Sequence, residues 1–441
     1  PSKPGLSNSE MRAELTAILD RCAADNLNAV IFQIRPQGDA LYDSKYEPWS
    51  YYLTGKQGLA PEGGFDPLEF VVEEAHDRGL EVHCWFNPFR ANHPSQRGEL
   101  SSRSVARRTP SIVKQYGSYM WMDPGEQRVQ DWSFNVFMDV VERYDIDGVH
   151  IDDYFYPYPS YAKGADFPDG PSWQAYVDSG GTMTRDDWRR DNVNKFVERV
   201  YKGIKERKPW VKFGISPFGI YRPGEPEGIK STFDQYAMLY ADCKLWLQNG
   251  WLDYFTPQLY WKMDGDQSYR ILLDYWNAQN TMNRHMWPGN FSGKMSPDLG
   301  DWPAQEILDQ ITFTRDRGDE GNVFYSMNTF MRDYKSINEL LTTGLYKRKA
   351  IVPASPWLDD TPPDPPTCTL DRKNGLLTLA GAGKDDRFYA IYADKGDGLQ
   401  LVRETSVERT QIAGLGLSNA TTVAVSIVDK SGNESTLQQL P

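Results

Sequence analysis

The chain has 441 residues, of which 39% are hydrophobic, and a formal net charge of −13. It contains no apolar run near the roughly 20 residues that cross a bilayer, and its acidic balance disfavours nucleic acids and anionic membranes as partners. The four cysteines lack metal-site spacing, so we expect no zinc site, no disulfide framework, and no metal or cofactor.

Up to about residue 350 the chain alternates strand-like and helix-like patterns. Apolar, β-branched or aromatic runs occur at 28–36, 81–89, 148–156, 212–219, 254–261, 285–292 and 322–330. Helical patterns occur at 10–25, 67–78, 127–144, 188–207, 234–249, 269–280 and 304–317. This alternation predicts parallel strands joined by right-handed crossovers.

Two α/β architectures fit these seven strands. Because a TIM (β/α)₈ barrel has eight, either the first strand is missing from the chain or the sheet is open and doubly wound. A doubly wound sheet often carries a glycine-rich phosphate loop after a strand, and none follows these runs. We therefore predict an α/β TIM barrel, without its first strand, over residues 1–350.

The composition changes after residue 350. Residues 351–366 are proline-rich, which is typical of a stiff, extended linker. Strand-like runs follow at 376–379, 387–393, 399–402 and 421–428, with no helical pattern between them. Short strands at this spacing predict a small all-β sandwich over residues 367–441.

Polar residues recur at every second position of the strand-like runs, and we call such a set of alternate positions one parity. Successive side chains of a strand point to opposite faces, and in a barrel one face meets the helices while the other faces the interior. The apolar parity must meet the helices, so the polar parity points into a shared mouth. On that parity lie Gln33, Arg35, His83, Trp85, Asn87, His150, Asp152, Gly214, Ser216, Thr256, Gln258, Tyr260, Ser326 and Asn328. Such a lining suits a sugar, which needs many hydrogen bonds and flat apolar platforms, although a purely structural polar network is the alternative.

Two adjacent carboxylates end the run at 148–156. Asp152 has the inward parity, and Asp153 lies one residue later, at a rim position where the strand leaves the sheet. Glycoside hydrolysis generally uses one carboxylate as nucleophile or base and another as acid. We assign the first role to Asp152 and the second to Asp153, with weaker alternatives for the acid among Asp39, Glu47 and Glu225.

Other polar residues are expected to bind substrate. Arg35 and Arg90 are predicted to hold a carboxylate substituent of the ligand or to keep Asp152 ionised, because a nearby cation lowers a carboxylate pKa. His150 is predicted to orient Asp152, with a structural histidine as the alternative. Further substrate contacts are predicted for Gln33, Asp39, Trp85, Asn87, Tyr154, Ser216, Tyr221, Gln258, Tyr260, Trp261 and Asn328.

Several long motifs give the chain a family resemblance. They are FQIRPQGDA at 32–40, SKYEPWS at 44–50, AHDRGLEVH at 75–83, NPFR at 87–90, the segment at 144–159, GISPFG at 214–219 and PQLYW at 257–261. In these motifs the chain resembles the glycosyl hydrolase-like 10 family of bacterial envelope proteins. The resemblance implies a TIM barrel with glycoside hydrolase activity, and one relative type acts at the division site on peptidoglycan glycans stripped of their peptides. The C-terminal region looks like a fibronectin type III module.

We therefore expect a glycoside hydrolase of a bacterial cell-wall or related aminosugar polysaccharide, with peptide-free peptidoglycan glycan favoured. Its place would be the periplasm, the exterior or the cell envelope, and a lipid anchor upstream of residue 1 is compatible with this expectation. Two alternatives stay open: a glycan-binding barrel without turnover, and a hydrolase of a neutral polysaccharide.

Overall fold

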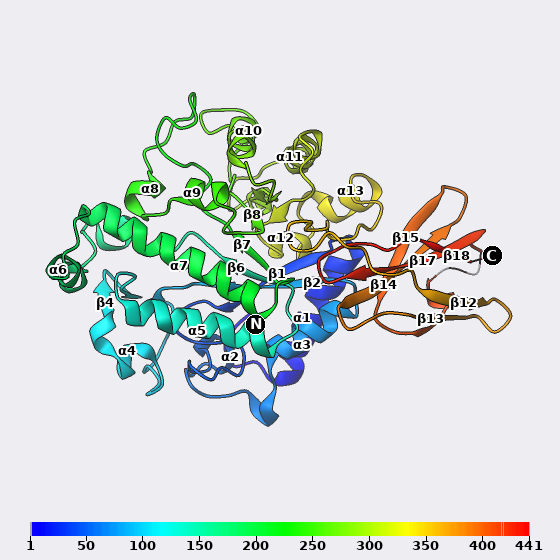
Figure 1. The fold of residues 1–441 in the computed structure, drawn as a ribbon, viewed down its shortest axis with the longest axis horizontal. Coiled ribbons are helices and arrows are strands. Elements are labelled where there is room, and N and C mark those ends of the chain that lie inside the picture. The colour runs from blue at the N-terminus through cyan, green and yellow to red at the C-terminus, as the bar shows by residue number, and fades with distance from the viewer. Residues whose placement is uncertain (1, 416, 418, 441) are drawn as a thin grey trace. The chain divides into compact units, whose positions relative to one another are not determined.

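The computed structural model of the protein describes residues 2–415, 417 and 419–440 (Figure 1). The chain divides into two compact units. The first comprises Pro1–Leu15, Ile31–Phe70 and His83–Thr329, and the second comprises Thr16–Val30, Val71–Val82 and Phe330–Pro441. The predicted domain boundaries, 1–350, 351–366 and 367–441, stay a prediction.

The first unit is organised by a parallel sheet. Its strands lie in the order β1 (Ala29–Arg35), β2 (Glu81–Phe86), β6 (Gly148–Ile151), β7 (Lys212–Ile215), β8 (Tyr254–Phe255) and β9 (His285–Met286). A further parallel pair joins β10 (Gly289–Asn290) to β11 (Val323–Phe324). The strand order follows the chain without the reversal of a doubly wound sheet, so that alternative is wrong. The predicted mixed α/β class with parallel strands is confirmed, and closure into a barrel stays a prediction.

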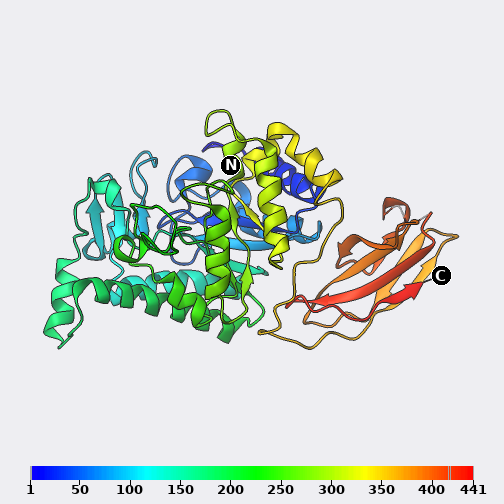
Figure 2. The ribbon, with the colours of Figure 1, turned by 90° about the horizontal axis from the view of Figure 1, so that it is seen from above.

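Helices precede, separate and follow these strands. They are α1 (Asn8–Ala24), α2 (Tyr51–Thr54), α3 (Pro67–His76), α4 (Val105–Arg108), α5 (Gln127–Arg143), α6 (Gly170–Asp178), α7 (Arg185–Arg207), α8 (Gln235–Met238), α9 (Cys243–Gln248), α10 (Tyr269–Gln279), α11 (Ala304–Asp316), α12 (Asn328–Met331) and α13 (Ile337–Thr343). The long helices α5 and α7 run side by side in both ribbon views (Figures 1 and 2). The single helix expected at 234–249 is two helices, because Asp242 caps a new start at α9. Within the described ranges, none of the helices is both long and apolar enough to cross a membrane.

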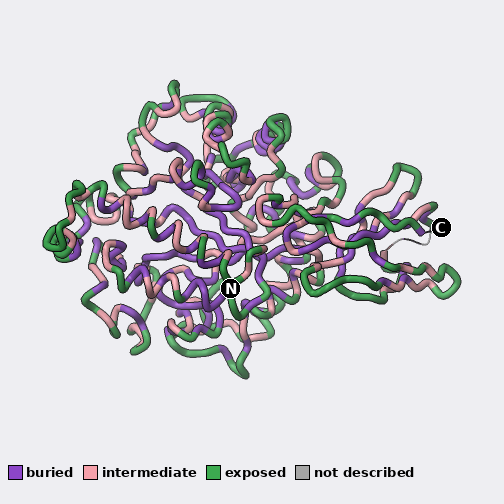
Figure 3. The backbone as a smooth tube through the Cα atoms, in the orientation of Figure 1, coloured by how far each residue is buried: buried purple, intermediate pink, exposed green. Residues whose placement is uncertain are grey.

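The parallel strands from β2 to β10 are buried almost throughout, which is typical of strands covered by helices, whereas most residues of β1 and both residues of β11 are partly exposed (Figure 3). Four of them are shorter at their C-terminal ends than predicted, because a proline, which cannot donate to a ladder, closely follows the paired residues. The prolines are Pro88 after β2, Pro217 after β7, Pro257 after β8 and Pro288 after β9. The residues that directly follow β2, β7 and β8 are therefore loop residues, to which the alternation of a strand does not apply.

The last predicted strand needs a correction. The run expected at 322–330 pairs only through β11, and Asn328 is instead the exposed first residue of the short helix α12. Strand parity therefore gives no direction for the side chain of Asn328, and its predicted inward position on a strand is wrong.

Glycines make room for large side chains inside the parallel sheet. A Cβ atom on Gly214 of β7 would lie 1.9 Å from the ring of Tyr254 on β8, and one on Gly148 would lie 2.4 Å from Nδ1 of His83. We expect Gly214→Ala to lower the free energy of unfolding by about 1–3 kcal/mol, because the fixed ring must shift. Denaturant unfolding measures the loss, and Gly170→Ala is the control, because no atom of the described residues lies within 4 Å of the added atom. Equal stability of the two variants would contradict this packing.

A small antiparallel sheet follows β2 and was not predicted. It contains β3 (Arg90–Asn92), β4 (Val113–Tyr116) and β5 (Tyr119–Met122), in the order β3-β5-β4. Sequence patterns missed it because its strands are only three or four residues long. It matters for the site because it carries Arg90 and Tyr119.

In the second unit, the segment that begins at Thr367 forms two antiparallel sheets, coloured orange to red in Figure 2. One contains β12 (Thr367–Asp371), β13 (Leu376–Ala380) and β16 (Arg409–Gln411); the other contains β14 (Asp386–Asp394), β15 (Leu399–Thr405), β17 (Thr422–Asp429) and β18 (Gln438–Leu440). Both sheets contribute to one apolar core that includes Leu377, Ile391 and Val425. Its assignment as a fibronectin type III module stays a prediction.

Candidate active site

The two adjacent carboxyl groups lie directly after β6, and both are buried. Asp152 is 3% exposed and Asp153 is 4% exposed, so both carboxyl groups are buried at the point where the chain leaves β6. Oδ2 of Asp152 accepts a hydrogen bond from Nε1 of Trp85 at 2.9 Å. Oδ2 of Asp153 accepts one from the hydroxyl of Tyr158. Each carboxyl group therefore has its own aromatic donor.

Burial and nearby charges shift the pKa values of this pair. Burial and then the neighbouring charge of Asp153 raise the pKa of Asp152 to about 7. Burial also raises the pKa of Asp153, against hydrogen bonds from Tyr158 and Gln258 and the charge of Arg90. Burial and the neighbouring negative charge thus both favour the protonated form of Asp152.

Next to the pair lies Arg90, whose guanidinium is 4.4 Å from the ring centroid of Tyr154. The backbone N–H of Arg90 donates to Oδ1 of Asn87 at 2.9 Å, and Nη1 donates to the carbonyl of Pro36 at 3.1 Å. The Nε of Arg90 is buried and has no hydrogen-bond partner within the part of the chain that is described. Arg90 thus places its own positive charge, and one N–H donor without a hydrogen-bond partner among the described residues, beside the two carboxyl groups.

Arg35 has a different role from the predicted one. It is fully buried, and its Nε and Nη2 donate to the two oxygens of Glu47 at 2.7 and 2.6 Å. Its Nη1 donates to the carbonyl of Asn87, and Trp132 Nε1 donates to Glu47 at 2.9 Å. Because these nitrogens and both Glu47 oxygens are engaged inside the protein, neither Arg35 as a substrate ligand nor Glu47 as the acid is supported.

His150 and Ser216 belong to a buried chain of hydrogen bonds. The hydroxyl of Tyr254 lies 2.8 Å from Nδ1 of His83 and 3.0 Å from Nδ1 of His150, and Nε2 of His150 lies 2.8 Å from Oγ of Ser216. Burial, and then the charge of His83, lower the pKa of His150 to about 3, so the imidazole stays neutral. Both of its ring nitrogens are occupied, so the predicted contact of His150 with Asp152 or substrate is corrected to a structural role.

Asp39 lies in a cluster of amides rather than beside Asp153. Its Oδ2 accepts hydrogen bonds from Nε2 of Gln37 at 2.8 Å and Nε2 of Gln57 at 3.0 Å. Burial raises the pKa of Asp39 to about 6 even though both amides donate to it. Asp39 is fully buried, and its other oxygen has no hydrogen-bond partner inside the described ranges. This cluster depends on residues that sequence reasoning did not single out.

Three predicted residues from the loop after β8 lie near the carboxyl pair or the aromatic side chains around it. Nε2 of Gln258 donates to the carbonyl of Ser216 at 2.8 Å, and its side chain also donates to Asp153. Burial and the charge of Asp153 raise the pKa of Tyr260. Trp261 packs against Phe218 at 5.6 Å between ring centroids. Gln33 on β1 is half-buried, and its contact with substrate stays a prediction.

Two predicted site residues from the loop after β7 have partners away from the carboxyl pair. The hydroxyl of Tyr221 donates to Asp242 at 3.0 Å, and the Tyr221 ring is only 7% exposed. Oε1 of Glu225 accepts from Lys244 at 2.7 Å and from Tyr275 at 2.8 Å. Both side chains are thus engaged in contacts with the α9 and α10 helices instead of the carboxyl pair.

Comparison with known proteins identifies the family. The sequence profile of the glycosyl hydrolase-like 10 family matches residues 7–289. The chain belongs to the glycosyl hydrolase-like 10 family. The family and the enzyme class predicted from the sequence, a glycoside hydrolase, are therefore both confirmed.

Two curated relatives support this membership. Glycosyl hydrolase YngK of Bacillus subtilis (strain 168) is 38% identical over an alignment that covers 99% of this chain and 89% of YngK. Glycosyl hydrolase DigH of Escherichia coli (strain K12) is 37% identical, over 58% of this chain and 60% of DigH. Among solved structures, an endo-beta-1,4-mannanase from Thermotoga petrophila covers 99% of this chain and 97% of its own, with 9% identity and a TM-score of 0.47. That likeness is too low to carry a conclusion.

This family member has site residues that parity did not predict. Tyr158, Tyr161 and Tyr119 come from a loop, a short 3-10 helix (Pro159–Ala162) and the unpredicted sheet. The only sequence signal for the first two was the run of aromatic residues after Asp153. Side chains in loops do not alternate regularly between two faces, so the sequence did not predict where these loop tyrosines point.

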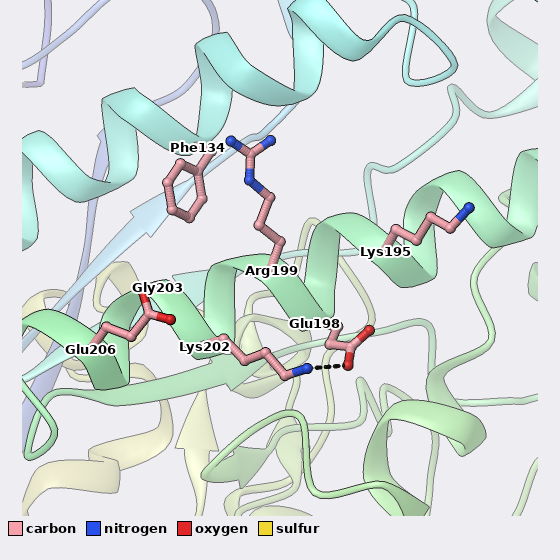
Figure 4. A pocket seen from close by; sticks show the side chains of 7 residues that line it. All are labelled: Phe134, Lys195, Glu198, Arg199, Lys202, Gly203 and Glu206. Carbon is pink, nitrogen blue, oxygen red and sulfur yellow. Dashed lines mark hydrogen bonds and ion pairs between the residues drawn. The ribbon is translucent and has the colours of Figure 1, made fainter.

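A surface pocket is lined by residues that do not include the carboxyl pair. It lies along α7 and its neighbour α5, and an ion pair of 2.6 Å between Lys202 and Glu198 crosses it (Figure 4). Its lining is Phe134, Lys195, Glu198, Arg199, Lys202, Gly203 and Glu206. Within residues 2–415, 417 and 419–440, no group of three or more His, Cys, Asp or Glu side chains is placed to hold a metal ion.

Proposed function

We propose that this enzyme hydrolyses glycosidic bonds of an aminosugar polysaccharide in the bacterial cell envelope, with peptide-free peptidoglycan glycan as the favoured substrate, and that it works outside the cytoplasm. The observation that carries the proposal is the buried pair Asp152 and Asp153, with raised pKa values, at the end of β6. Acid-assisted cleavage of a glycosidic bond needs one protonated and one ionised carboxyl group. We propose that Asp152 and Asp153 hold one proton between them near neutral pH, which supplies both states.

The neighbours of the pair favour a sugar ligand. Tyr154, Tyr158, Tyr260 and Trp85 are all partly exposed and offer rings and polar groups around the carboxyl oxygens. The cation and unused donor of Arg90 suit an acidic substituent, such as the lactyl carboxylate of a wall sugar. This combination favours the wall glycan over a neutral polysaccharide.

The proposal is tested by incubating the protein with peptide-free peptidoglycan glycans, intact peptidoglycan and chitooligosaccharides, and measuring new reducing ends. We expect the fastest release from peptide-free glycans. No new reducing ends from any of the three, with the protein folded, would overturn the proposal. Faster release from a neutral plant polysaccharide would overturn the substrate class alone.

The shared proton sets the pH dependence. The pKa of Asp152, raised to about 7, suits the acid, so we now assign the acid role to Asp152 and the ionised role to Asp153, the reverse of the expectation from the sequence. The acid must be protonated, so kcat/KM should fall as the pH rises through about 7. The other carboxyl group must be ionised, so kcat/KM should also fall on the acid side. Tyr158→Phe removes the donor to Asp153 and should move the acid limb to higher pH. A flat profile between about pH 5 and pH 9 would contradict the shared proton.

A substitution of Arg90 tests whether the enzyme prefers glycans that carry carboxylate groups over neutral ones. Because its charge also acts on both carboxyl groups, its removal would slow every substrate, and a charge-conserving change is sharper. We expect Arg90→Lys to lower kcat/KM about 10-fold more for glycans that carry lactyl carboxylates than for chitooligosaccharides, since lysine lacks the planar fork. Comparison of the two kcat/KM ratios measures this. Equal losses would favour a neutral polysaccharide.

A further inference from the structure

Six aromatic rings form a continuous row past the carboxyl pair. The row consists of Tyr119, Tyr161, Tyr158, Phe233, Phe218 and Trp261, and each ring is partly exposed. Successive ring centroids along it lie 4.1, 5.8, 5.1, 4.8 and 5.6 Å apart. We call this set the aromatic row.

The aromatic row crosses the strand ends in the order of the sheet. Tyr119 belongs to the small sheet inserted after β2, and Tyr158 and Tyr161 follow β6. Phe218 and Phe233 follow β7, and Trp261 follows β8. Because β2, β6, β7 and β8 are successive neighbours, the row runs from one side of β6 to the other.

The carboxyl pair meets this row between its two ends. Tyr158, the third ring, donates its hydroxyl to Asp153. Tyr161 and Tyr119 continue on one side of that contact, and Phe233, Phe218 and Trp261 continue on the other. A core cluster would bury its rings, whereas every ring here keeps part of its surface accessible.

We propose that the aromatic row binds sugar rings on both sides of the scissile bond, so that the enzyme cuts inside glycan chains and not from their ends. This inference rests on the proposed function and adds the mode of cleavage to it. The apolar faces of sugar rings stack on aromatic rings, and tyrosine hydroxyls can accept or donate hydrogen bonds to sugar hydroxyls. An enzyme that removes terminal sugars needs such platforms on one side of its acid only.

The mode of cleavage is read from early products. A glycan labelled at its reducing end and long enough to extend past both ends of the row is digested briefly, and the fragments are sized. We expect labelled fragments of many lengths from the first time point. Release of only mono- or disaccharides from one end would overturn the inference while leaving glycoside hydrolysis intact. Absence of any cleavage would instead count against the proposed function.

Truncation of the two end rings tests the row itself. Tyr119→Ala and Trp261→Ala should each raise KM for long glycans about 2- to 10-fold, the range of one stacking contact, and shift the cut positions toward opposite ends of the chain. Tyr119→Phe and Trp261→Phe keep a ring and should restore both KM and the cutting pattern. Met282→Ala is the control, since Met282 is 43% exposed and lies in the turn before β9, at the other end of the strands. Unchanged cut positions in both Ala variants would overturn the role of the row.

Discussion

Asp152→Asn is expected to lower kcat by about 10²- to 10⁴-fold, the range that a positioned acid or base contributes. The amide keeps the size of the side chain and its contact with Trp85 Nε1, but it can neither ionise nor share the proton of Asp153. Release of reducing ends from peptide-free glycans measures the loss. Asp153→Asn should show a comparable loss, because either change leaves the pair unable to supply both protonation states.

The same substitution should stabilise the fold at alkaline pH. The folded pKa of Asp152 is raised to about 7, so the native state binds its proton more tightly than the unfolded chain does. The stability of the wild type therefore falls as the pH rises from the unfolded pKa, near 4, through about 7. Asp152→Asn escapes this loss, and we expect a gain on the order of 3 kcal/mol at pH 8 and little difference at pH 4.

A stable but inactive variant separates chemistry from folding. Asp264→Asn is the matched control, because the Asp264 side chain is 82% exposed and the substitution is the same. Asp264→Asn should keep both activity and stability. If Asp152→Asn were active, or less stable than wild type at pH 8, the assignment of a buried, proton-sharing pair would be wrong.

The sequence predicted the parallel strands well because their Val, Ile and Phe runs must be buried on both faces. It also placed Asp152 and Trp85 on one parity, and the structure joins them by a hydrogen bond of 2.9 Å. Parity predicts the face of the sheet to which a side chain points, but not how deeply that side chain is buried. Arg35, with the same parity, is fully buried with Glu47 because desolvation strongly favours a paired guanidinium.

What lay beyond the strand ends was less predictable. Tyr221 and Glu225 were predicted as site residues from a loop. In the structure, Tyr221 donates a hydrogen bond to Asp242 and Glu225 accepts one from Lys244. Tyr158 was missed for the converse reason, since its contact with Asp153 depends on loop conformation. The prolines after the strands were the available signal that parity would stop there.

The ion pair between Arg35 and Glu47 offers a large and separable stability effect. Both side chains are fully buried, so Glu47→Gln leaves the guanidinium without a countercharge in a low-dielectric interior. We expect this variant to lose about 3–5 kcal/mol of unfolding free energy. Glu198→Gln is the control, because its ion pair with Lys202 has the same 2.6 Å length while the two side chains are 32% and 63% exposed. That variant should lose less than about 0.5 kcal/mol.

A double variant shows whether the loss comes from the orphaned charge. Arg35→Met with Glu47→Leu removes both charges and keeps apolar volume, so it should recover most of the stability lost by Glu47→Gln. Activity should not recover with it, because Arg35 also donates to the carbonyl of Asn87, whose side chain in turn accepts from the backbone of Arg90. Denaturant unfolding and reducing-end assays on the same variants measure the two effects. Recovery of activity together with stability would mean that Arg35 does not help to position Arg90 beside Asp152 and Asp153.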